Sequence, residues 1–176
     1  MYIVLGRFQP FHKGHAYLVE AALAKGNTTI AIGSSQTDSS MDNPWGADER
    51  EEMILAWLNG REANIVQIPD INDPPNWVEH ATKFHGDGTL VTSDEGTKKL
   101  YEDSDFPVEW VDLNNRESYE GWRVRATLKM LSTVYETDGL REVMTHSIPS
   151  EVVDWLIDND ALYRLYSMSR DLEHVG

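Results

Sequence analysis

The sequence has 176 residues, no cysteine and a formal net charge of -15 at pH 7. This length fits one domain with a sizeable core. The acidic charge counts against general binding to nucleic acid or to an anionic membrane, and the lack of cysteine excludes disulfides and thiolate metal sites. The acidic excess fits either an ordinary acidic cytosolic protein or a protein adapted to high salt. No apolar run approaches the ~18 residues of a membrane span, and the first residues lack a signal-peptide pattern, so we expect a cytoplasmic protein.

The beginning of the chain predicts a strand, a helix and a second strand. Tyr2 to Leu5 is a short β-branched and aromatic run that ends at Gly6, as a buried strand does. Apolar residues recur at helical spacing from Gly14 to Lys25, and Gly26 supplies a stop. A further strand is predicted over Thr28 to Ile32. This order is a βαβ unit, which places two parallel strands in one sheet.

The middle of the chain repeats this alternation. A polar loop over residues 33–45 precedes a predicted helix over 47–58, and loops of this length are often functional. The proline-rich segment 69–75 is expected to be neither helix nor central strand. Asn76 is the expected cap of the next helix, and Ser93 of the one that reaches Tyr101. Strands are predicted over residues 63–68, 89–92 and 107–111.

After Asn114 the pattern becomes helical, with helices predicted over residues 123–131, 140–144, 150–157 and 162–168. The whole pattern predicts an α/β fold with a parallel sheet of about five strands and a small C-terminal helical extension. Ligands of such sheets bind beyond the carboxyl ends of the strands. We expect the core to span residues 1–130 and residues 131–176 to extend the same domain. Trp57, Trp110 and Trp155 are expected in the hydrophobic core.

Basic and imidazole side chains gather between the first strand and the first helix, at Arg7, His12, Lys13 and His15. In so acidic a chain, such a cluster favours an anionic ligand. The start of the following helix adds free N–H groups and the positive end of its dipole, which suits phosphate. His12 and His15 are three residues apart, so on one helical turn they face the same ligand. A structural role is the alternative, and a metal site has little support because no further ligand stands at matching spacing.

The decapeptide Gly6-Arg7-Phe8-Gln9-Pro10-Phe11-His12-Lys13-Gly14-His15 resembles the N-terminal signature of the nucleotidylyltransferases that carry the HxGH motif. It is most similar to that of the archaeal-type nicotinamide-nucleotide adenylyltransferases. The similarity continues in the same order at residues 33–36, 43–44, 49–50 and 68–72 and at Trp77, so it covers about residues 1–130. It implies a Rossmann-like, doubly wound sheet and a homo-oligomer.

The resemblance also implies a reaction. The 5′-phosphate of nicotinamide mononucleotide attacks the α-phosphorus of ATP, with Mg²⁺ shielding the triphosphate, and NAD and pyrophosphate are formed. Trp77 matches a position whose indole stacks on the nicotinamide ring. The implied catalytic residues are Arg7, His12, His15 and Arg125. The implied substrate-binding residues are Gly6, Phe8, Gly14, Ser34, Asn43, Arg50, Asp70, Asn72, Trp77, Ser93 and Arg123, and no protein ligand for a metal is expected.

One stretch departs from the pattern of this family. Where the family has serine or threonine before a basic residue, this chain has Glu120 and Trp122, while Arg125 matches and Arg123 is added. Each lost hydroxyl removes a contact worth roughly 1 kcal/mol, and a carboxylate there repels triphosphate unless it turns away. Two alternatives therefore stay open. One is a transferase for another acceptor or donor, such as pantetheine phosphate or CTP, and the other is a nucleotide-binding module without catalysis.

Overall fold

The computed structural model describes residues 1–114 and 119–173. Contacts between residues divide the chain into two compact units, each built from separate stretches of sequence. The first unit comprises Met1–Arg7, Gly14–Thr37 and Gly60–Asn114. The second comprises Phe8–Lys13, Asp38–Asn59 and Asn115–Gly176. The division expected at residue 130 falls inside the last of these stretches and stays a prediction.

The first unit contains a five-stranded sheet with the order β3-β2-β1-β4-β5, in which every neighbouring pair is parallel. This confirms the predicted α/β class and the doubly wound sheet. The order reverses between β1 and β4, and ligands of such sheets bind beyond the strand ends at this point. The strands are β1 (Tyr2–Gly6), β2 (Thr28–Ile32), β3 (Asn64–Gln67), β4 (Thr89–Thr92) and β5 (Val108–Trp110).

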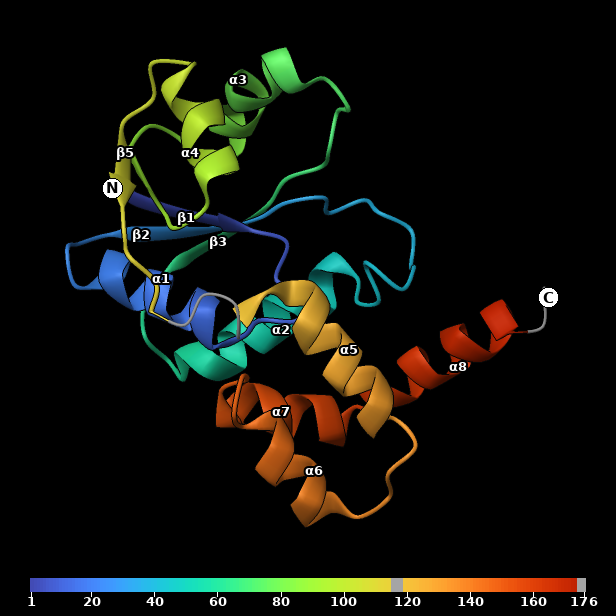
Figure 1. The fold of residues 1–176 in the computed structure, drawn as a ribbon. Coiled ribbons are helices and arrows are strands. Elements are labelled where there is room, and N and C mark those ends of the chain that lie inside the picture. The colour runs from blue at the N-terminus through green and yellow to red at the C-terminus, as the bar shows by residue number, and fades with distance from the viewer. Residues whose placement is uncertain (115–118, 174–176) are drawn as a thin grey trace. The chain divides into compact units, whose positions relative to one another are not determined.

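Three helices cover the two faces of this sheet. Helix α1 (Lys13–Leu23) follows β1, α3 (Pro74–His85) follows β3, and α4 (Glu95–Glu102) follows β4. Figure 1 shows α1 on one face and α3 and α4 on the other, as right-handed crossovers to either side of β1 require. The hydrophobic core under α3 and α4 contains Ile3, Ala31, Ile68, Val78, Ala81, Leu90 and Tyr101.

The second unit is helical. Helix α7 packs against α2, α6 and α8, and α5 packs against α6 and α8. Residues that recur at helical spacing are buried along these contacts, for example Met53 and Ile54 on α2 and Val152, Val153 and Leu156 on α7. The bounds are α2 (Ala47–Leu58), α5 (Gly121–Leu131), α6 (Thr137–Met144), α7 (Ser150–Asp158) and α8 (Ala161–Glu173). Within the described residues of both units, no helix is long and apolar enough to span a membrane.

The start of α3 differs from the sequence-based expectation. The helix begins at Pro74, and Asn76 lies inside its first turn with its side-chain amide donating to Asp73 Oδ2 at 2.7 Å. The prediction that Asn76 caps this helix is therefore wrong. Proline is tolerated at Pro74 and Pro75 because the first N–H groups of a helix have no partner within it. The proline-rich segment thus ends inside a helix.

The start of α4 and the place of Trp110 also differ from expectation. The carboxylate of Asp94 caps α4 by accepting from the backbone N–H of Thr97 at 2.8 Å, so the prediction that Ser93 is the cap is wrong. Trp110 is exposed, and its indole donates to Asp112. The expected core position is confirmed for Trp57, whereas the largest fully buried side chain is that of Trp45.

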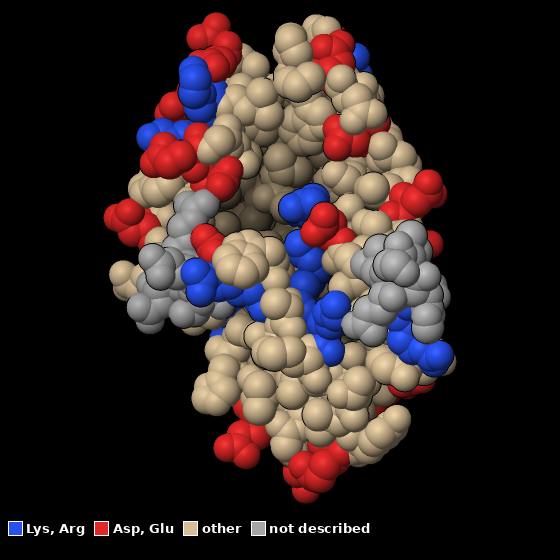
Figure 2. All heavy atoms as spheres, turned by 45° about the vertical axis from the view of Figure 1, so that its right-hand side comes forward, with Lys and Arg blue, Asp and Glu red and all other residues tan. Residues whose placement is uncertain are grey.

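The surface charge is mainly acidic. Figure 2 shows Asp and Glu side chains in several separate groups over the face that it draws. Some of the basic side chains pair with them, as Lys25 does with Glu109 and Lys99 with Asp103. Exposed pairs of this kind contribute little to stability. The high charge therefore bears more on solubility and on ligand charge than on the fold.

Candidate functional site

The predicted site residues of the first unit follow the carboxyl ends of the strands. Arg7 is exposed directly after β1, and Ser93 is buried directly after β4, the neighbour of β1 across the point where the strand order reverses. Gly6 ends β1, and its carbonyl accepts from the N–H of Gly33, which follows β2, at 2.9 Å. The structure therefore brings these residues to one edge of the sheet, where ligands of doubly wound folds bind.

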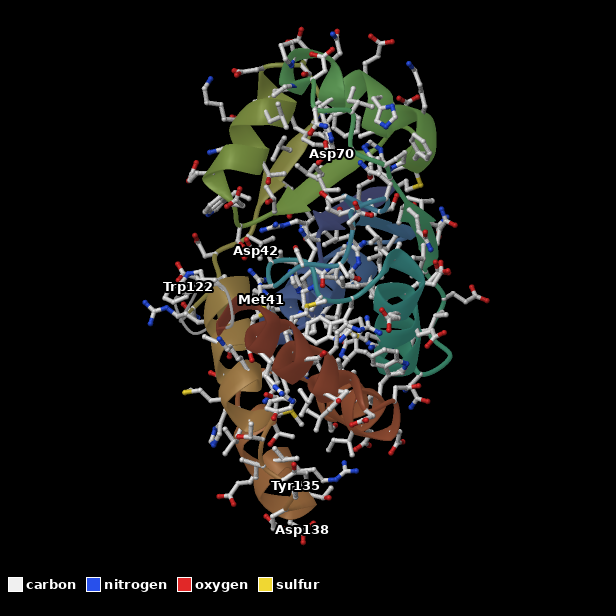
Figure 3. The ribbon with its side chains drawn as sticks, turned by 90° about the vertical axis from the view of Figure 1, so that its right-hand side faces the viewer. Met41, Asp42, Asp70, Trp122, Tyr135 and Asp138 are labelled. Atoms are coloured by element: carbon white, nitrogen blue, oxygen red, sulfur yellow. The ribbon has the colours of Figure 1, made fainter. Side chains whose placement is uncertain are left out.

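A polar cluster centred on Asp70 lies at the same edge (Figure 3). One carboxylate oxygen accepts from Ser34 Oγ at 3.2 Å, and the other accepts from the indole N–H of Trp77 at 3.2 Å. The side chain of Gln36 pairs with the backbone of Asp70 in both directions, at 2.9 and 2.7 Å. Three of the predicted residues, Ser34, Asp70 and Trp77, are thus held together by hydrogen bonds from different segments.

A cavity of about 480 Å³ opens beside this cluster. Its size is within the range of small-molecule sites. Trp77, Asp70 and Asp73 are among the residues that line it, and within the described part of the chain none of the lining residues is basic. Such a lining suits a flat group that is neutral or cationic rather than anionic. The lining residues are Leu5, Asp70, Asn72, Asp73, Pro74, Trp77, Thr97 and Leu100.

The start of α1 carries the remaining predicted residues of the first unit. Gly14 is buried in the first turn, and His15 follows it with its side chain half-buried. A helix start offers N–H groups and a positive dipole end, which favours phosphate. His12 directly precedes α1 and His15 is its third residue, so the two histidines stand where the helix begins, as predicted.

The loop that carries His12 belongs to the second unit. Phe8 and Phe11 are fully buried with their ring centroids 5.8 Å apart, and Phe11 packs on Trp57 at 4.9 Å. This burial gives Phe8, predicted to bind substrate, a packing role in the second unit. Lys13 Nζ donates to the carbonyl of Thr145 at 2.6 Å, which supports a structural role for this lysine.

His12 is buried, with its ring stacked on that of Tyr119 at a centroid distance of 6.4 Å. Burial is the main reason that the pKa of His12 falls to about 4; a backbone hydrogen bond opposes this shift, and the positive charge of Arg125 adds to it. The imidazole is therefore neutral at pH 7. A neutral imidazole donates one hydrogen bond to a phosphate oxygen without contributing a charge.

Arg125 supplies the positive charge beside His12. It is buried on α5, where Nη1 donates to the carbonyl of Gln9 at 3.1 Å and Nη2 lies 3.4 Å from Asp42 Oδ1. Asp42 is exposed in the loop before α2 (Figure 3), so this ion pair is weak. A Cβ atom at Gly121 would lie 3.2 Å from Nη1, which explains why glycine suits this position.

The departure at Glu120 and Trp122 forms one local cluster. Glu120 Oε2 accepts from the indole N–H of Trp122 at 2.8 Å and from Arg123 Nε at 3.1 Å. The guanidinium of Arg123 stacks over the Trp122 ring at 4.8 Å. Trp122 is exposed and projects outward in Figure 3. The carboxylate is therefore neutralised by its neighbour, and Arg123 takes part in an exposed ion pair.

Two further predicted residues lie around the start of α2. Arg50 is 1% exposed and donates from Nε to the carbonyl of Gly46 at 3.1 Å. Asn43 Oδ1 is buried, and among the described residues it has no hydrogen-bond partner. A buried oxygen without a partner is costly, and a donor on a ligand would satisfy it. Arg50 is thus placed in packing and Asn43 in a position suited to binding.

Sequence reasoning missed Asp73, Gln9 and Asp42. Asp73 stands one residue after the predicted Asn72 and lines the same cavity, so the run of acidic and amide residues was an available signal. Gln9 lies within the signature decapeptide, but its contact with Arg125 joins residues far apart in the chain. The pairing of Asp42 with Arg125 left no pattern in the sequence.

Comparison with known proteins gives a consistent result. The model of the cytidylyltransferase-like family matches residues 3–119. Nicotinamide-nucleotide adenylyltransferase of Thermoplasma acidophilum is 28% identical over 98% of this chain and 93% of its own length. The protein of the same name from Methanococcus maripaludis is 31% identical over 92% and 91%.

A solved structure shows the same fold. It is a bifunctional NMN adenylyltransferase/ADP ribose pyrophosphatase from Francisella tularensis, with a TM-score of 0.71 and 18% identity. The match covers 99% of this chain, which spans about half (53%) of the length of that structure. The extent of the family match and the similarity to the Methanococcus protein leave one assignment: the chain belongs to the cytidylyltransferase-like family.

Proposed function

We propose that the protein transfers the adenylyl group of ATP to nicotinamide mononucleotide, forming NAD and pyrophosphate. The observation that carries the proposal is the cavity beside Trp77. The nicotinamide ring of the mononucleotide is a pyridinium cation with a neutral amide, and the cavity offers it an indole face and two carboxylates. The archaeal relatives named nicotinamide-nucleotide adenylyltransferase, matched over most of their length, support the same reaction.

The chemistry requires no nucleophile from the protein. A phosphate oxygen of the mononucleotide forms a bond to the α-phosphorus of ATP, the bond from that phosphorus to the bridging oxygen breaks, and pyrophosphate leaves. The protein would orient the two anions and neutralise the charge that develops between them. In this proposal Arg7, His12, His15 and Arg125 are the residues that serve phosphate.

Arg125 and His12 would bind phosphate in different ways, one as a charged donor and the other as a neutral donor. The guanidinium of Arg125 can hold two phosphate oxygens at once, and the neutral imidazole of His12 can donate one further hydrogen bond. The weak pair between Arg125 and the exposed Asp42 would give way to a phosphate. The buried Oδ1 of Asn43, which has no hydrogen-bond partner among the described residues, could accept from a donor on the nucleotide.

Mg²⁺ is proposed to accompany ATP. Among the described residues, no group of three or more His, Cys, Asp or Glu side chains could hold a metal ion. Mg²⁺ commonly takes its oxygen ligands from substrate phosphates and water, with few from the protein. The donor set around His12 and Arg125 thus fits a metal carried on the triphosphate, where it would shield negative charge.

The direct test is the reaction itself. Purified protein incubated with ATP, Mg²⁺ and nicotinamide mononucleotide should release NAD and pyrophosphate, measured by chromatography and by a pyrophosphate assay. His15→Ala should lower the rate at least about a hundredfold if the imidazole contributes ~3 kcal/mol to the transition state. No NAD above the level of a blank would reject the function, and a near-normal rate in the variant would reject the role of His15.

The two alternative functions, a nucleotide-binding module without catalysis and a transferase for another acceptor, are less well supported. The binding module without catalysis was prompted by Glu120 and Trp122, but the carboxylate is paired with Arg123. A transferase for pantetheine phosphate has no use for an indole and two carboxylates at the acceptor site. Calorimetry with NAD and the same activity assay with other acceptors would separate these functions from the proposed one.

We also propose that the chain forms a homo-oligomer through its C-terminal helices. Large apolar side chains are exposed around the link between α5 and α6, with Tyr135 exposed by 96% and Met130 by 70%. Figure 3 labels Tyr135 in this link. Exposed apolar groups of this size favour an interface between copies. Light scattering should give a mass above that of one chain, and Tyr135→Ser should lower it. A monomer in the unaltered protein would refute this part.

A further inference from the structure

Arg164 on helix α8 forms hydrogen bonds to the segment that leads into α2. Arg164 Nη1 donates to the carbonyl of Pro44 at 2.8 Å and to Glu49 Oε2 at 2.5 Å, and Nη2 donates to Glu49 Oε1 at 2.6 Å. A two-pronged contact of this kind fixes direction as well as distance. Burial alone would raise the pKa of Glu49, but hydrogen bonds from Arg164 and from the N–H of Gly46 lower it below its ordinary value.

The same carboxylate holds the start of α2. Glu49 Oε2 accepts from the N–H of Gly46 at 2.8 Å, and the carbonyl of Gly46 accepts from Arg50. Glycine has no side chain to return this contact, so Glu49 alone caps the N–H that precedes the helix, and this contact fixes the path by which the chain enters α2. Arg164 thus contacts the segment at Pro44, and through Glu49 it also holds Gly46, on either side of Trp45.

Trp45 carries this restraint to the loop of His12. Its carbonyl accepts from Gln9 Nε2 at 2.7 Å, and its N–H donates to Gln9 Oε1 at 3.1 Å. The carbonyl of Gln9 in turn accepts from Arg125. Gln9 stands three residues before His12, so one amide side chain and its backbone connect the segment before α2 with both groups proposed to meet the triphosphate.

We propose that Arg164 is a positioning residue for adenylyl transfer, which aligns the loop of His12 and the guanidinium of Arg125 by holding the Pro44–Gly46 segment. The inference rests on the proposed function. Arg164 contacts no reacting group and acts through Glu49, Trp45 and Gln9. The competing explanation is that its ion pair contributes only to the stability of the helical unit.

Steady-state kinetics separate these two roles. Arg164→Met should lower kcat about tenfold or more, with less than about a twofold change in the KM for nicotinamide mononucleotide. Arg164→Lys keeps the positive charge but loses the planar guanidinium that donates two hydrogen bonds to Glu49, so its kcat should be intermediate. Arg141→Met is the matched control, because the Arg141–Asp154 ion pair joins α6 and α7 in the same unit and does not involve the Pro44–Gly46 segment. Its kcat should be unchanged.

A double-mutant cycle tests the route. If Arg164 acts through Gln9, the variant with both Arg164→Met and Gln9→Ala should lose no more activity than the more damaged single variant. Losses that multiply would show independent effects and would overturn the route. Equal kcat values for Arg164→Met and Arg141→Met would overturn the positioning role.

A measurement without turnover keeps this inference separate from the proposed function. The imidazole of His12, assigned in NMR spectra by comparison with His12→Gln, should titrate near pH 4 in the unaltered protein and in Arg141→Met. In Arg164→Met the pKa should rise towards 6.5, because a released loop admits water. If the unaltered protein makes no NAD but the pKa of His12 still rises in Arg164→Met, adenylyl transfer is rejected and the positioning contact is retained. If the pKa of His12 stays near 4 in Arg164→Met, the positioning role of Arg164 is refuted.

Discussion

The buried imidazole of His12 makes stability depend on pH in a defined window. Burial lowers the pKa of His12 to about 4 in the folded protein, against 6.5 for an ordinary histidine. Between these values the unfolded chain binds a proton that the folded chain does not, so acidification favours unfolding. Each pKa unit corresponds to about 1.36 kcal/mol, which puts the stability lost between pH 6.5 and pH 4 at about 3 kcal/mol.

The perturbation that isolates this effect is His12→Gln, since glutamine retains a donor and does not titrate. Urea unfolding followed by tryptophan fluorescence would give the free energy of unfolding at pH 7.5, 5.5 and 4.5 for both proteins. Carboxylates titrate equally in the two, so their contribution cancels in the difference. The unaltered protein should lose about 1 kcal/mol more than the variant by pH 5.5 and about 2.5 kcal/mol more by pH 4.5.

A second histidine in the helical unit provides the control. His146 is an exposed histidine of the same unit, so His146→Gln shows whether any histidine replacement there has the same effect. Parallel pH dependence of the unaltered protein and His12→Gln would refute the argument. It would mean that the imidazole is reached by water or protonated in the folded state, and the description of His12 as a neutral donor would fail with it.

Three further changes address the proposed reaction. Trp77→Ala should raise the KM for nicotinamide mononucleotide about tenfold, because aromatic contact with a cationic ring is worth roughly 1 to 2 kcal/mol. Trp77→Phe should restore most of the lost affinity, and equal KM values for the two variants would place the nicotinamide ring elsewhere. Asp73→Asn should raise the relative use of nicotinate mononucleotide about fivefold, since removing a negative charge near the ring carboxylate is worth about 1 kcal/mol, and an unchanged ratio of kcat/KM values would contradict this. Gly121→Ala should lower kcat several-fold by displacing Arg125, with the KM for the mononucleotide unchanged; a normal kcat would show that the guanidinium has room to move.

The strands were predictable because parallel strands covered on both faces leave continuous apolar runs. β2 is buried along its whole length and was predicted with the bounds that it has, Thr28 to Ile32. Helix starts were less predictable. A proline segment such as Pro74-Pro75 is compatible with a loop or with a first helical turn, and only the packing of the following residues decides between them.

Tryptophan burial could not be read from the sequence for a similar reason. Trp110 ends an edge strand, where the sheet has no further neighbour to cover it, while Trp45 follows a proline in a loop and is buried. Composition assigns the same preference to both residues. The difference arises from contacts between segments that are distant in the chain, as with Gln9 and Trp45.

The signature decapeptide has a property that its letters do not reveal. Arg7 and Gly14 belong to the sheet unit, whereas Phe8 to Lys13 belong to the helical unit, so the chain changes unit twice within the motif. Its two aromatic residues are therefore needed for packing in the helical unit, and its polar residues for the proposed chemistry. The spacing within the motif therefore serves packing and the proposed chemistry at once, whereas the contacts around Arg164 join residues far apart in the chain.

The cluster at Glu120 shows how a departure from a family pattern is compensated locally. Glutamate in place of a hydroxyl residue would add negative charge where phosphate is expected. Here Arg123 neutralises that charge, and the exposed Trp122 both donates to the carboxylate and lies under the guanidinium. The three side chains thus satisfy one another, and Arg125 is left on the buried side of α5 with its contact to Gln9. The change is best understood as a coordinated replacement of three residues, in which reverting Glu120 alone would release Arg123 rather than restore the pattern of the family.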